Sequence, residues 1–93
     1  MKAHLNGTTV ADSETTERVE GNHYFPPQSL VDAHFEPSDR TTHCGWKGTA
    51  NYFHLVVDGK RFENAAWVYK EPLPKAEHIR DHVAFYPMVD VSE

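Results

Sequence analysis

Residues 49–59 read TANYFHLVVDG and give the clearest strand signal in the chain. Phe53, Leu55 and Val57 fall on one face of an extended chain, and the residues between them fall on the other. Asp58-Gly59 then favours a two-residue type I′ turn, because both positions of that turn need a positive φ. The stretch therefore predicts a strand that turns back on itself and begins an antiparallel sheet.

Shorter strands are expected on both sides of this stretch. They are residues 3–5 and 8–10 around Asn6-Gly7, then 17–20, 60–62, 64–70 and 82–89. A short helix is expected through residues 29–35, ended by Pro37, and one or two helical turns through 75–81. Tight turns join most of these strands, so the sequence predicts a mainly β, antiparallel fold of about seven strands and one or two short helices.

Alternation also predicts which side chains share a face in the last two strands. Ala65, Trp67 and Tyr69 are expected on one face of their strand. In the final strand, Val83 and Phe85 are expected on one face, opposite the residues that alternate with them.

Length and charge limit the classes of function. The 93 residues make one domain, residues 1–93, with nine basic against fourteen acidic side chains and no run of basic residues. This balance argues against a nucleic-acid partner and against an anionic membrane surface. No apolar stretch is long enough to span a bilayer, and the first residues have no apolar signal-peptide core. With a single cysteine, the chain fits a reducing, cytoplasmic environment.

The single cysteine, Cys44, lies in the unusual stretch TTHCGWKG, residues 41–48. A nearby histidine or Lys47 could lower its pKa and make it a nucleophile. The alternative is a small buried apolar residue, which is the commoner place of a free cysteine. The glycines of GWKG also suggest a phosphate loop, but the spacing is wrong. The alternative there is a turn whose glycines, Gly45 and Gly48, allow positive φ beside a solvated lysine.

Metal ligands show no recognisable spacing. Seven histidines are scattered along the chain, and no Cys-x-x-Cys pair occurs. We therefore expect neither a metal nor a cofactor.

Amphipathic aromatic residues are the remaining candidates for a site. His23, Tyr24, Trp46, Trp67 and Tyr69 lie near turns or on predicted strands, and such side chains can line a pocket and orient a ligand by their polar ends. The alternative is packing in a small core, and the sequence leaves both interpretations open.

Four segments in this order, EGNHYFPP, TTHCGWKGTANYF, NAAWVYKEP and HVAFY, resemble the small bacterial family called domain of unknown function 427. The resemblance covers residues 2–89, although Gly45 replaces the proline usual beside the cysteine. It implies a β-tent, or Mss4-like, architecture of two antiparallel sheets. The cysteine knuckles that bind zinc in other β-tent groups are absent here. A nucleotidyltransferase label attached to the family has no support from a carboxylate pair or nucleotide loop.

The first functional hypothesis is a binding module with a shallow aromatic and polar cleft for a small metabolite or a peptide end. Its candidate ligand-binding residues are His23, Tyr24, Thr42, Cys44, Trp46, Lys47, Trp67 and Tyr69. The alternatives are an enzyme that uses Cys44, or His23 and Lys47 as acid and base, and an interaction domain that forms a homodimer.

Overall fold

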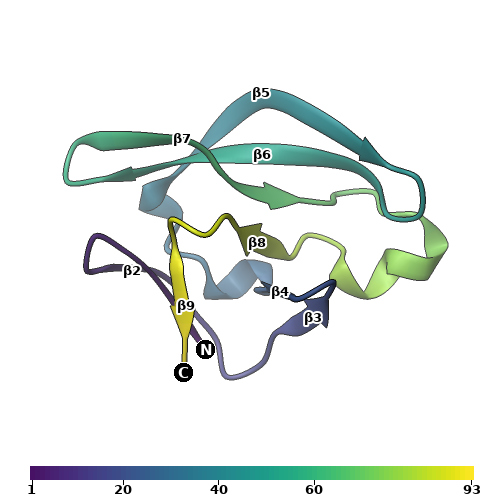
Figure 1. Ribbon diagram of the computed structural model, residues 1–93, viewed down its shortest axis with the longest axis horizontal. Coiled ribbons are helices and arrows are strands. Elements are labelled where there is room, and N and C mark those ends of the chain that lie inside the picture. Colours follow the sequence, from purple (N-terminus) through teal and green to yellow (C-terminus); the bar gives the residue numbers. More distant parts are fainter.

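The strand that dominates the sequence lies at the centre of the largest sheet. In a computed structural model that describes all residues 1–93, β6 (Gly48–Val57) pairs on one side with β5 (Phe35–Cys44) and on the other with β7 (Lys60–Val68). The short strand β8 (Val83–Phe85) completes the antiparallel order β5-β6-β7-β8. Figure 1 shows the three long strands lying together along one side of the molecule.

Two smaller antiparallel sheets complete the architecture. One has the order β2-β1-β9, formed by β1 (Lys2–Leu5), β2 (Thr8–Asp12) and β9 (Asp90–Ser92), and it holds both chain ends side by side (Figure 1). The other is the hairpin of β3 (Glu17–Val19) and β4 (Asn22–Tyr24). Directly after β4, the backbones of Phe25 and Val83 exchange two hydrogen bonds of 2.8 Å. The hairpin therefore continues the four-stranded sheet beyond β8.

Three short 3-10 helices are the only helical segments. They are η1 (Pro27–Ser29), η2 (Asp32–His34) and η3 (Pro74–Ile79). No helix is long and apolar enough to cross a membrane. The mainly β, antiparallel prediction is confirmed, with nine strands in three sheets in place of about seven in two.

The expected helix through residues 29–35 is wrong. Leu30 is extended and bridges Ala11 in β2, so the chain forms only the single turns η1 and η2. Phe35 already belongs to β5, and Pro37 lies within that strand opposite Phe53. Proline is tolerated there because β5 is an edge strand of its sheet.

The predicted hairpin turns are confirmed by the backbone. Asn6-Gly7 has φ of 50° and 79°, and Asp58-Gly59 has φ of 53° and 74°. These positive values at both positions are those that a type I′ turn requires. A third turn of the same form, Glu20-Gly21 with φ of 53° and 81°, joins β3 to β4.

The two faces of the long sheet cover two separate clusters of buried side chains. The main core consists of Ala3, Leu5, Val10, Ala11, Phe25, Leu55, Val57, Ala65, Ala66, Val68, Val83, Phe85 and Val89. The second, which we call the tyrosine cluster, consists of Val19, Tyr24, Ala50, Tyr52, Tyr69, Ala76, Ile79 and Ala84, with Cys44, Trp67 and Tyr86 against it. Leu55 and Val57 of β6 and Val83 and Phe85 of β8 thus face the main core, whereas Ala50, Tyr52 and Ala84 face the tyrosine cluster, as their alternation predicts.

One predicted face is partly wrong. Trp67 and Tyr69 share the tyrosine cluster, but Ala65 packs in the main core. Asn64, just before it, has a left-handed φ of 52°, and the pairing of β7 with β6 shifts register between Phe53 and Leu55. This bulge turns the chain by one position, so Ala65 leaves the face that simple alternation assigns to it.

Candidate functional site: an aromatic cavity beside the tyrosine cluster

Trp67 connects the tyrosine cluster to the protein surface. Its indole Nε1–H donates a hydrogen bond of 3.1 Å to the hydroxyl of Tyr24, a residue with no exposed surface. Its ring also packs edge-on against the half-buried Tyr86, with centroids 4.8 Å apart. Burial raises the pKa of Tyr24, so this hydroxyl stays neutral and keeps its hydrogen bond well above neutral pH.

A chain of hydroxyl groups runs along the same face of the sheet. The hydroxyls of Thr42 and Tyr52 lie 2.9 Å apart, and the Tyr86 hydroxyl donates to that of Tyr52 at 3.5 Å. The Arg40 guanidinium lies 5.1 Å from the centre of the Tyr52 ring. Burial is the largest single influence on the pKa of Tyr52 and raises it, but hydrogen bonds from Thr42, Tyr86 and Arg40 outweigh burial and lower the pKa overall.

Lys47 is the one charged residue buried in the protein, with 7% of its surface exposed. It lies in the loop from β5 to β6, and its ammonium donates to the carboxylate of Glu20 in the β3–β4 turn. Burial alone lowers the pKa of Lys47, yet the hydrogen bond to Glu20 and the nearby Tyr24 and Tyr69 raise it overall. The same hydrogen bond lowers the pKa of Glu20. Both groups are therefore charged at neutral pH, and the alternative of a turn with a solvated Lys47 is wrong.

A cavity of about 470 Å³ opens beside this cluster. It lies among the β3–β4 hairpin, the end of β8 and the C-terminal strand, and its lining residues are Gly21, Asn22, His23, Trp67, Phe85, Tyr86, Pro87, Val89 and Val91. Five of the nine are hydrophobic, and they form an aromatic and aliphatic wall. His23 adds a polar imidazole ring to the lining, and its Nδ1 lies 2.8 Å from the Thr16 hydroxyl.

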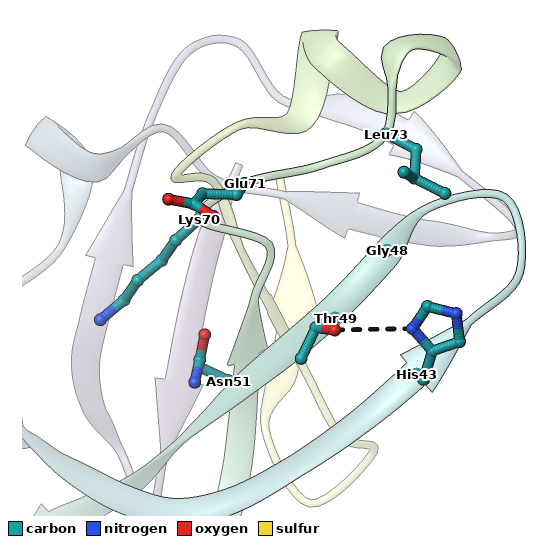
Figure 2. A pocket seen from close by; sticks show the side chains of 7 residues that line it. All are labelled: His43, Gly48, Thr49, Asn51, Lys70, Glu71 and Leu73. Atoms are coloured by element: carbon teal, nitrogen blue, oxygen red, sulfur yellow. Dashed lines mark hydrogen bonds between the residues drawn. The ribbon is translucent and has the colours of Figure 1, made fainter.

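A second hollow of about 500 Å³ lies near the β5–β6 turn and is of a different kind. Figure 2 shows its seven lining residues, of which Leu73 is the one hydrophobic member. His43 and Thr49 face each other across the two strands at 3.5 Å, whereas the Lys70 ammonium points away from that pair (Figure 2). Because ligand sites are usually lined by apolar and aromatic side chains, the cavity at Trp67 is the better candidate.

The structure divides the predicted site residues into three groups. His23 and Trp67 line the cavity. Four others lie at the tyrosine cluster. Tyr24 and Tyr69 belong to it, Cys44 packs against it, and Thr42 is linked to it by a hydrogen bond to Tyr52. Trp46 is 38% exposed and lines a separate hollow of about 400 Å³, and Lys47 lies in the interior and lines no cavity.

Two of the three pairings considered for an enzyme, Cys44 with His43 and His23 with Lys47, make no hydrogen bond in the structure. Cys44 packs against the tyrosine cluster, while His43, one residue earlier, points to the other face and lines the hollow of Figure 2. His23 contacts Thr16, whereas Lys47 contacts Glu20. Nor do three or more histidine, cysteine or carboxylate side chains gather where they could hold a metal ion.

Several residues of the site were not predicted from the sequence. Phe85, Tyr86 and Val89 complete the cavity wall, Tyr52 anchors the hydroxyl chain, and Glu20 binds the buried lysine. Tyr52 could have been found, because it is an aromatic residue on the face of the central strand opposite Phe53 and Leu55.

The fold and the cavity define a small antiparallel β-domain with an aromatic-walled hollow. A family model described as a domain of unknown function, number 427, matches residues 1–93, and the chain therefore belongs to this family. The resemblance noted from the four sequence segments is thus confirmed over the whole chain. No curated protein matches the chain.

Proposed function

We propose that this protein is a binding module for a small, planar, partly apolar molecule, which occupies the cavity at Trp67. The observation that carries the proposal is the lining of that cavity, where aromatic and aliphatic side chains outnumber polar ones. Its volume of about 470 Å³ lies within the range of about 300–1,000 Å³ typical of small-molecule sites.

The aromatic wall favours a flat ligand. The Trp67 ring is held in place by its hydrogen bond to Tyr24 and by its edge contact with Tyr86. A wall of fixed aromatic rings loses little side-chain entropy when a ligand stacks on it. The polar side chains at this site are Asn22 and His23, and each can donate or accept a hydrogen bond.

The test is a screen of planar aromatic fragments by ligand-observed NMR against the wild type, His23→Ala and His4→Ala. His4 is a matched control, because it is also half-buried, its Nδ1 lies 3.2 Å from the Thr9 hydroxyl, and it lines none of the cavities. We expect fragments that bind the wild type and His4→Ala with similar Kd values. The same fragments should bind His23→Ala about tenfold more weakly, because that variant loses about one hydrogen bond to the ligand.

Two results would count against the proposal. One is the absence of any hit that competes for a single site on the wild type. The other is a set of hits whose Kd values respond equally to the His4 and His23 substitutions, which would place the ligand elsewhere.

A further inference from the structure

The ion pair of Lys47 and Glu20 joins a fixed, buried cation to an accessible anion. The Lys47 side chain is 9% exposed, and that of Glu20 is 52% exposed. The Lys47 carbonyl accepts a 2.9 Å hydrogen bond from the amide of Leu73, which ties the β5–β6 loop to the segment before η3. The ammonium is therefore part of the interior, while the carboxylate reaches it from the surface.

The surroundings of the Lys47 ammonium leave it one anionic partner. The ammonium also lies over the rings of Trp46 and Tyr69, whose centres are 5.4 and 5.6 Å from Nζ. Of its three N–H donors, only one has a hydrogen-bond acceptor, the Glu20 carboxylate. A carboxylate at this position is therefore the main compensation for the buried charge.

The residue type at position 20 is not the one that its turn prefers. The chain has three turns of the same form, and their first positions are Asn6, Glu20 and Asp58, with φ of 50°, 53° and 53°. Asn and Asp tolerate the left-handed region, whereas glutamate there costs about 1–2 kcal/mol. The turn itself thus does not account for Glu20, but a side chain long enough to reach Lys47 does.

We propose that Lys47 forms a carboxylate-binding site, which Glu20 occupies in the free protein and yields to the carboxylate of a ligand. The carboxylate can come from a small organic acid or from a peptide C-terminus, since both present the same two oxygens. Glu20 can leave by a movement of its turn, because its side chain is half-exposed and its only other side-chain partner is Trp46, which is itself exposed. This site is distinct from the cavity at Trp67, which Lys47 does not line.

The test uses Glu20→Asn, which keeps a residue suited to the turn and removes the carboxylate. Asp58→Asn is the matched control, because it makes the same charge change at an exposed turn of the same form. The melting temperature of each protein is measured against sodium acetate at constant ionic strength, with sodium chloride as the balancing salt. Acetate at ten times its Kd stabilises a folded protein by RT ln 11, about 1.4 kcal/mol, which is roughly 6–11 °C for a domain of this size.

We expect a lower melting temperature for Glu20→Asn than for the wild type, and a saturable recovery with acetate. Asp58→Asn and the wild type should change by less than about 1 °C under the same conditions, and Glu20→Asn combined with Lys47→Met should lose the response. Equal responses of Glu20→Asn and Asp58→Asn, or no response at all, overturn the proposal. If Glu20→Asn does not fold, Glu20→Gln takes its place with the same expectations.

Two further probes identify the source of the carboxylate. N-acetylglycine, which imitates a peptide C-terminus, is compared with acetate on Glu20→Asn, and the tighter binder shows which source the site prefers. Inorganic phosphate should stabilise less than either acid, and an equal effect of phosphate refutes selectivity for carboxylates. None of these measurements involves His23 or Trp67, so failure here and failure of the fragment screen are independent.

Discussion

Replacement of Tyr24 by phenylalanine tests whether the buried hydrogen bond to Trp67 holds the site together. The substitution removes one oxygen from a side chain with no exposed surface and leaves the Trp67 N–H without its acceptor at 3.1 Å. The loss of a buried neutral partner costs about 1–3 kcal/mol, and the half-buried position of Trp67 lets water replace part of it. We expect a loss of about 1–2 kcal/mol in the free energy of unfolding, or roughly 5–15 °C in melting temperature.

The assay is urea unfolding followed by tryptophan fluorescence, together with a thermal melt by circular dichroism. Tyr86→Phe is the matched control, because it also removes a hydroxyl at the cluster, but one whose hydrogen bond is 3.5 Å long and whose residue is half-exposed. That variant should lose less than about 0.5 kcal/mol. A Tyr24→Phe protein as stable as Tyr86→Phe would refute the claim that the indole is held by this bond.

Three more outcomes are expected from the same structure. Leu55→Ala should lose about 2–5 kcal/mol in urea unfolding, because Leu55 has no exposed surface and packs in the main core. Gly48→Ala should lose about 1–3 kcal/mol, since φ is 110° there and a Cβ would lie 3.4 Å from backbone atoms of Glu71 and Leu73; a neutral result contradicts the strain argument. Burial raises the pKa of Tyr24 and Tyr69 in the folded state, so their contribution to the free energy of unfolding is complete below about pH 10 and is lost as the pH rises further. Above about pH 10, the free energy of unfolding should therefore fall more steeply with pH for the wild type than for Tyr24→Phe.

The parts of the fold that the sequence predicts are those with strong local signals. The turns at Asn6-Gly7 and Asp58-Gly59 depend on two adjacent residues, and the central strand depends on simple alternation. The long edge strand β5 was missed because none of its ten residues is buried. With no buried face, an edge strand has no hydrophobic alternation to detect, although it pairs over most of its length with β6.

The candidate site could be predicted in composition but not in arrangement. Amphipathic aromatic residues and the family pattern pointed to Trp67, Tyr24 and Lys47, all of which lie at or beside the tyrosine cluster. The contact between Lys47 and Glu20 joins residues 27 positions apart, in the turns of two hairpins from different sheets, and no local pattern encodes it. The cavity is likewise lined both by His23 and by Val91 near the C-terminus, and these residues lie at the same cavity only once the sheets have assembled.

Neighbouring residues at the end of β4 serve different cores. Tyr24 faces the tyrosine cluster and Phe25 faces the main core, and neither has any exposed surface. A displacement of this strand as a whole would therefore open both cores to water at once, and the backbone bonds of Phe25 to Val83 would break with them. The hairpin is consequently held in place at its base, where β4 ends. Glu20 and Gly21 at the tip are exposed, so a movement limited to this turn would expose Lys47 and leave the rest of the molecule folded.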